Sequence, residues 1–189
     1  MADAERAEPV SARRQAPLAG LHGGSGVARL TPAAPATRLS LRARPDMVAA
    51  LGAALGLALP TKPKSSASAG GRHALWLGPD EWLVIDETEA DLMGALDAVT
   101  GLYSATDISH RNTAILIEGP GAANALNAGC PQDLSLTVFP VGACSRTVFG
   151  KSEVVLYRTS DAAFRVECWR SFSPYVFGLL AEGAEDAGV

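Results

Sequence analysis

The chain has few of the features that mark metal-binding, secreted or membrane proteins. Its three cysteines, Cys130, Cys144 and Cys168, lie far apart and form no CxxC pair, which argues against a zinc cluster or a thioredoxin-type site. No apolar run reaches the roughly 18 to 20 residues that cross a bilayer. The first residues are acidic and lack the apolar region of a signal peptide. We therefore expect a cytoplasmic protein that does not bind a membrane.

The common catalytic motifs are also missing. The sequence contains no GxGxxG, GxxxxGK[ST], HExxH or GxSxG. The glycine-rich stretch 23–26 has no strand before it and no Lys-Ser/Thr after it, so it does not match a phosphate-binding loop. His22, His73 and His110 do not fall at metal-ligand spacing. We therefore expect no catalytic, cofactor-binding or metal-binding residue on this chain.

The composition is that of a folded domain. Hydrophobic residues make up 48% of the 189 residues and charged residues only 19%, which supplies ample material for a core. Lys and Arg number 16 against 20 Asp and Glu, giving a net charge of -4. This balance lacks the basic footprint that nucleic-acid binding needs.

The chain divides into a tail, a single domain and a short end. Residues 1–37 are rich in Ala, Pro, Gly and Arg and lack periodicity, which predicts a flexible tail that is disordered alone or wraps a partner. Residues 38–182 form the predicted domain, and residues 183–189 are expected to fray. Within the domain, the Ser-, Gly- and Pro-rich stretch 61–71 predicts a flexible surface loop.

The apolar pattern predicts an α+β fold with mixed or antiparallel sheets and packed helices. Helices are expected after Pro45, Thr88, Pro120 and Ser173, with Met93 among the core residues of the second. Predicted strands lie at 37–43, 73–77, 82–86, 103–109, 114–117, 146–149, 154–157 and 164–169. Because strands occur in pairs between helices, a doubly wound parallel sheet is not expected.

The densest polar cluster, Asp107 to Asn112, contains Asp, Ser and His. On a strand Asp107 and Ser109 point to one face and His110 to the other, so they do not form a hydrolase triad. We interpret the cluster as a strand end and turn in which Arg111 pairs with a carboxylate or contacts a partner. A ligand contact is the alternative.

Aromatic residues gather near the last predicted helix, where Trp169 and Phe172 accompany Arg170. Core packing explains most of them, but an aromatic patch with arginine also suits a protein–protein hot spot. Trp76 and Trp82 fit either a core or an interface position. The residues that we predict to contact a partner are Arg111, Arg146, Arg170, Phe172 and Tyr175.

Several short segments together resemble the gamma subunit of heterotetrameric sarcosine oxidase. Each is weak alone, but their order and spacing over residues 37–182 are fairly specific. They are Leu77–Leu83 (LGPDEWL), Asp107–Arg111 (DISHR), Ile117–Pro120 (IEGP), Asn127–Leu134 (NAGCPQDL), Arg146–Thr147 and Arg170–Tyr175 (RSFSPY).

The resemblance implies a complex and a reaction. Such oxidases have four different subunits and demethylate sarcosine oxidatively to glycine and hydrogen peroxide, releasing formaldehyde or forming 5,10-methylenetetrahydrofolate. FAD, FMN and NAD sit on the larger subunits, and tetrahydrofolate accepts the one-carbon unit. The gamma subunit looks like the folate-binding domain of the glycine-cleavage T-protein and of TrmE. It docks mainly on the alpha subunit, beside the beta and delta subunits.

The folate-binding elements of that domain are not retained. T-proteins carry an Arg followed by Tyr-Thr-Gly-Glu before a strand, whereas this chain has Arg158-Thr159-Ser160-Asp161 there. Asp161 is a poor substitute for the missing carboxylate. The resemblance therefore implies a non-catalytic accessory subunit, because a fold alone does not confer activity.

Two other functions remain open. A free-standing folate-binding or aminomethyl-transferring protein would need a carboxylate in its central cavity, with Asp86, Asp107 and Asp161 as candidates. A subunit of a related demethylase for another N-methyl amine is the second.

Overall fold

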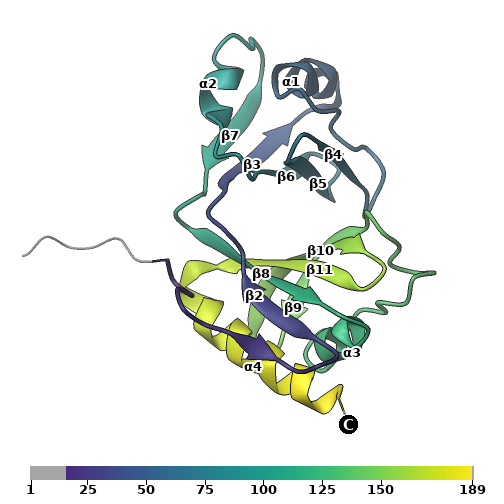
Figure 1. Ribbon diagram of the computed structural model, residues 1–189. Coiled ribbons are helices and arrows are strands. Elements are labelled where there is room, and N and C mark those ends of the chain that lie inside the picture. The colour runs from purple at the N-terminus through teal and green to yellow at the C-terminus, as the bar shows by residue number, and fades with distance from the viewer. Residues whose placement is uncertain (1–15, 189) are drawn as a thin grey trace, which may run out of the picture.

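Two antiparallel sheets face each other, and helices cover their outer faces (Figure 1). The structure is a computed structural model that describes residues 16–188. The six-stranded sheet has the order β1-β2-β8-β11-β10-β9, and the five-stranded sheet has the order β4-β5-β6-β3-β7. Every strand pair in the described residues is antiparallel, so the predicted α+β class is confirmed in its antiparallel form.

Each sheet collects strands from distant parts of the chain. The six-stranded sheet contains β1 (Gly23–Gly24), β2 (Arg29–Pro32), β8 (Asn112–Glu118), β9 (Cys144–Phe149), β10 (Ser152–Ser160) and β11 (Ala163–Trp169). The five-stranded sheet contains β3 (Thr37–Ala43), β4 (Ser66–Ala69), β5 (Arg72–Gly78), β6 (Glu81–Asp86) and β7 (Tyr103–Asp107). The helical elements are the 3₁₀ turn η1 (Pro45–Met47), α1 (Val48–Ala54), α2 (Leu92–Leu96), α3 (Ala122–Asn127), the 3₁₀ turn η2 (Arg170–Phe172) and α4 (Ser173–Asp186).

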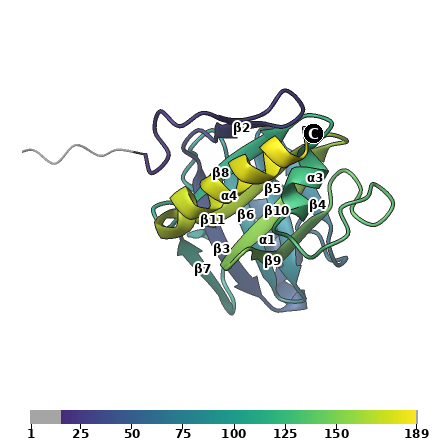
Figure 2. The same ribbon diagram turned by 90° about the horizontal axis from the view of Figure 1, so that it is seen from below.

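The layers follow from the two-residue alternation of the strands. On β6, Trp82 and Val84 pack outward with α1 and α2, while Leu83 and Ile85 pack inward between the sheets. On the six-stranded sheet, Val166 faces the large core under α3 and α4. Figures 1 and 2 show α4 lying across the outer face of this sheet. Three apolar layers therefore alternate with the two sheets.

The prediction of a flexible tail over residues 1–37 is wrong for residues 16–37, which the structure describes. Strands β1 and β2 lie within it, and β2 pairs with β8 in the register Leu30 with Ile117. Leu18, Ala28 and Leu30 are buried in the core under α4. The physical reason is that β2 forms its hydrogen bonds with the edge of β8, and the local sequence pattern contains no sign of this long-range pairing. Residues 1–15 lie outside the described residues.

Three smaller predictions also need correction. The predicted flexible loop 61–71 contains strand β4, which pairs with β5. The predicted frayed end begins inside α4, where Gly183 and Ala184 are buried, and only Val189 lies outside the described residues. Met93 is 40% exposed rather than part of the core. No helix within residues 16–188 is long and apolar enough to span a membrane.

Candidate partner-contact site

A polar cleft of about 230 Å³ opens between the two sheets, where β8 begins and β11 ends. The antiparallel register places Asn112 of β8 opposite Trp169 of β11, and both line the cleft. From the facing sheet, Glu81 and Trp82 at the start of β6 line it as well. The cleft thus combines charged groups with aromatic rings.

Arg111 and the aromatic residues form one exposed patch at the mouth of this cleft. The Arg111 guanidinium lies 4.1 Å from the centroid of the Trp169 ring, which is cation–π geometry. The Trp169 and Phe172 rings tilt against each other at 5.9 Å. Trp169 is 37% exposed and Phe172 is 44% exposed. We call Arg111, Trp169 and Phe172 the aromatic patch.

The local backbone explains why the patch forms. Strand β11 ends at Trp169, and η2 then turns the chain so that Phe172 lies against it. The Arg170 N–H donates to the Arg111 carbonyl at 2.7 Å, which joins this turn to the loop before β8. The predicted contact residues Arg111, Arg170 and Phe172 therefore meet. Trp169 was assigned to the aromatic cluster but not to the predicted contact residues.

Arg146 also lines the cleft. Its guanidinium on β9 donates to both carboxylate oxygens of Glu81 on β6, at 2.5 and 3.1 Å. Hydrogen bonding to Glu81 raises the pKa of Arg146, and the nearby Glu153 carboxylate adds to this. This fork-shaped pair links the two sheets, so Arg146 has a structural role beside the predicted contact role.

Tyr175 stands in the first turn of α4, one turn after Phe172. Its hydroxyl accepts a hydrogen bond from the Lys151 N–H at 3.2 Å, which fixes the ring against the β9–β10 hairpin. The side chain is nevertheless 44% exposed. Tyr175 therefore extends the exposed aromatic surface along α4.

The space behind the cleft is filled by buried ion pairs that sequence reasoning missed. Glu167 of β11 accepts from Arg38 of β3 at 2.6 Å and from Arg165 at 2.8 Å. The exposed fractions of these three side chains are 0%, 3% and 4%, respectively. Arg165 also donates to Glu87 at 2.8 Å. The interior between the sheets thus holds paired charges at this point.

The three candidate folate carboxylates lie outside the cleft. Burial alone would raise the pKa of Asp86, but hydrogen bonds from Thr88 and the Arg72 guanidinium outweigh it and lower the pKa to about 2. Asp107 accepts from the Ser109 N–H at 2.8 Å, and hydrogen bonds from Ser109 lower its pKa. Asp161 lies in the turn between β10 and β11. None of the three lines the cleft between the sheets.

Arg158, at the start of the stretch that corresponds to the folate loop, is a core residue. It is 2% exposed, and its guanidinium packs 4.2 Å from the Phe164 ring centroid. It donates to the backbone carbonyls of Asp161, at 2.6 Å, and of Leu134. Within residues 16–188, no three His, Cys, Asp or Glu side chains are grouped as metal ligands would be.

The sequence and the fold both match one group of known proteins. The family described as "Sarcosine oxidase, gamma subunit family" matches residues 40–186. Sarcosine oxidase subunit gamma of Corynebacterium sp. (strain U-96) is 33% identical over 155 residues, which cover 79% of this chain and 76% of that one. The Arthrobacter sp. subunit gamma is 36% identical over 136 residues, or 69% of this chain and 67% of its own length.

Solved structures agree with these matches. A chain of heterotetrameric sarcosine oxidase from Corynebacterium sp. U-96, in complex with pyrrole 2-carboxylate, superposes with a TM-score of 0.83 at 30% identity and covers 93% of this chain and 97% of its own. The glycine cleavage aminomethyltransferase T of Bartonella henselae superposes with a TM-score of 0.59 at 14% identity, covering 80% of this chain and 44% of that one. The second likeness concerns the fold alone.

Proposed function

Because the chain belongs to the sarcosine oxidase gamma subunit family, we propose that it serves a heterotetrameric sarcosine oxidase as an accessory subunit that contributes no catalytic residue. It is a subunit of an oxidoreductase complex, as its resemblance predicted. In this proposal it docks mainly on the alpha subunit, beside the beta and delta subunits. FAD, FMN, NAD and tetrahydrofolate bind to the other subunits, and the complex oxidatively demethylates sarcosine.

The aromatic patch carries the docking part of this proposal. Exposed Trp and Phe side chains with a stacked arginine are the residue types that dominate binding energy at protein interfaces. Because Arg111 and Phe172 both contact the Trp169 ring, the patch is preorganised and loses little side-chain entropy on binding. The buried free thiols of Cys130, Cys144 and Cys168 suit the reducing cytoplasm that we propose as its location.

Co-expression with the alpha, beta and delta subunits tests the proposal. We expect Phe172→Ala and Trp169→Ala to weaken retention of this chain in the complex by about tenfold or more, since each removes an exposed ring of the patch. Leu102→Ala is the matched control, because Leu102 is 71% exposed outside the patch. It should change retention by less than about twofold. Retention can be measured as the intact fraction on serial dilution.

Arg111→Lys separates stacking from charge. Lysine keeps the positive charge but lacks the planar guanidinium that lies on Trp169. If the stacked geometry carries binding, Arg111→Lys weakens retention nearly as much as Arg111→Ala. If the wild type and all patch variants are retained equally, the aromatic patch does not contact a partner subunit. Peroxide formation on sarcosine by the purified single chain would overturn the accessory role.

The same preparations address the two other functions. A folate-binding protein would show tetrahydrofolate binding by the isolated chain at high micromolar concentration. The engaged states of Asp86 and Asp107 support the opposite expectation of no binding. Peroxide assays of the complex with sarcosine and with other N-methyl amines establish which amine it oxidises.

A further inference from the structure

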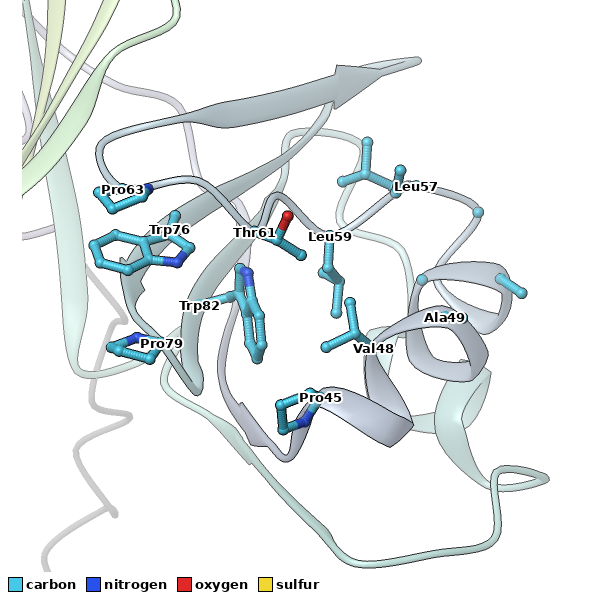
Figure 3. Close-up of a pocket in the computed structure, with 14 residues that line it drawn as sticks. Pro45, Val48, Ala49, Leu57, Leu59, Thr61, Pro63, Trp76, Pro79 and Trp82 are labelled. Carbon is cyan, nitrogen blue, oxygen red and sulfur yellow. The ribbon is translucent and has the colours of Figure 1, made fainter.

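A large apolar groove lies on the outer side of the five-stranded sheet, away from the ion pairs between the sheets. It has a volume of about 950 Å³ and runs from η1 and α1, past the loop after α1, to the β5–β6 hairpin (Figure 3). Its walls include Trp76, Trp82, Val48 and Leu59, with Pro45, Pro63 and Pro79 around them. Apart from the indole N–H groups of the two tryptophans, Thr61 is the one lining side chain that carries a polar group.

The groove is open because small side chains face it from α1. Ala49 and Ala53 line it and are exposed, whereas Leu51 and Leu55 on the other side of the same segment are fully buried. The Trp82 N–H donates to the Pro60 carbonyl at 2.7 Å, which fixes the indole in the wall. An apolar hollow of this size on the surface of a folded domain marks an interaction site.

The charges beside the groove point to the chemistry of its occupant. Arg44 directly precedes Pro45, and Lys62 lies between Thr61 and Pro63, so exposed cations flank the groove on two segments. Within residues 16–188 neither Arg44 nor Lys62 has an ion-pair partner. Asp46, two residues after Arg44, also lacks one, so it offsets only one of the two positive charges. The uncompensated charge of this rim is therefore positive.

The acidic residues on the far rim are already neutralised. Asp80 pairs with Arg42 at 2.9 Å, and Glu81 pairs with Arg146. They offer no free carboxylate to a cationic occupant. Complementarity therefore favours an occupant whose apolar side chains are flanked by carboxylates.

We propose that the groove receives a segment of a partner subunit that carries large apolar side chains with Asp or Glu beside them. This inference rests on the proposed docking function and extends it. The groove adjoins the proposed docking site at the β5–β6 hairpin, where Trp82 is among the residues that line both the groove and the cleft between the sheets. The β5–β6 turn also joins them, with Pro79 on the groove and Glu81 at the cleft. One extended surface then runs from the aromatic patch to α1.

Neighbouring alanines on α1 provide a matched test. Ala49 lines the groove, whereas Ala50 is equally an exposed alanine of the same helix but does not line it. In the co-expressed complex, Ala49→Glu places a carboxylate in the apolar hollow and should weaken retention of this chain about tenfold or more. Ala50→Glu should change retention less than about twofold. Circular dichroism and thermal melting of both chains check that each variant is folded.

A charge reversal tests the acidic flank of the occupant. Lys62→Glu should weaken retention several-fold at low salt and reduce its dependence on salt, whereas Lys62→Gln should have an intermediate effect. If Lys62→Glu instead strengthens retention, the flank of the occupant is basic and the proposal is wrong.

Cross-linking in the purified complex identifies the occupant. A photoreactive benzoylphenylalanine at position 49 should cross-link to a partner-subunit peptide with apolar residues next to Asp or Glu, and one at position 50 should not. Cross-links to a second copy of this chain, or none at all, would overturn the inference. If the wild-type chain fails to join the complex, the proposed function fails. If it joins and Ala49→Glu behaves as Ala50→Glu does, only the groove proposal fails.

Discussion

Asp86 shows how single side chains hold the ends of strands in this fold. It ends β6, is 1% exposed and accepts hydrogen bonds from the Arg72 guanidinium at 2.7 Å and from the Thr88 N–H at 2.9 Å. It was one of the carboxylates that the folate-binding alternative would need in its central cavity. The structure shows instead a carboxylate that organises the turn into α2.

We expect Asp86→Asn to lower the free energy of unfolding by about 2 kcal/mol at pH 7. The pKa of Asp86 lies near 2 in the folded chain, below the ordinary value of 3.8, so its ionised form stabilises the fold. This contribution is fully present above about pH 4 to 5 and is lost as the pH falls towards 2. Urea unfolding of both chains between pH 7 and pH 2 measures it.

Asp97→Asn is the control for this experiment, because Asp97 is exposed on the surface. Its unfolding curve should follow that of the wild type at each pH. A difference between Asp86→Asn and wild type that stays constant down to pH 2 would show that the charge of Asp86 does not contribute.

At the scale of elements, β2 joins the N-terminal segment to the main sheet. It pairs with β8 over four residues, and its Leu30 is 2% exposed in the core under α4. Gly24, with a φ of +99°, turns the chain between β1 and β2, and a Cβ there would lie 2.1 Å from the Ala28 carbonyl oxygen. The segment therefore belongs to the fold and closes one edge of β8.

Leu30→Ala should destabilise the chain by about 3 kcal/mol, because it removes a buried side chain and leaves a cavity. Leu21→Ala in the same segment is the matched comparison, since Leu21 is 39% exposed. It should cost less than about 1 kcal/mol. Equal midpoints for the two variants in guanidinium unfolding would mean that β2 does not pack as described.

The elements that could be predicted from the sequence are those with strong apolar periodicity. Strands β3 and β11 have alternating apolar residues, β6 has a continuous apolar run and helix α4 has a helical apolar pattern, and all four were predicted within a few residues. Strands β1, β2 and β4 were not, because β1 and β4 consist of glycine, serine and alanine, while β2 is only four residues long and pairs with the distant strand β8. Such pairing is a tertiary effect that a local pattern does not contain.

At the scale of the whole molecule, ion pairs join the two sheets and so fix the positions of the surfaces that a partner can contact. The Arg146 pair with Glu81 and the Arg38 pair with Glu167 each join one sheet to the other. Arg38 and Glu167 are 129 residues apart, so no spacing rule indicates their contact. The aromatic patch was partly predictable because Trp169 and Phe172 lie close together in sequence, whereas the position of Arg111 on Trp169 depends on strand register.

Glu167→Gln tests whether these buried charges hold the sheets together. The substitution keeps the shape but leaves Arg38 and Arg165 short of one negative charge in the interior, and breaking a buried pair in this way costs about 3 kcal/mol or more. Glu153→Gln on the same sheet is the control, because the Glu153 side chain is 52% exposed. It should cost less than about 1 kcal/mol. Chemical unfolding measures both values.

The double variant Arg38→Met with Glu167→Met then separates charge from packing. Removing both partners of a buried pair leaves no uncompensated charge on either of them, so the double variant should lose less stability than the sum of Arg38→Met and Glu167→Met alone. If the losses simply add, the two residues act independently and the ion pair does not join the sheets.

If the coupling is present, the cleft and the aromatic patch depend on it, because the pair holds β3 against β11, which ends at Trp169. The double variant should then be retained in the complex less than the wild type only to the extent that its folding is destabilised.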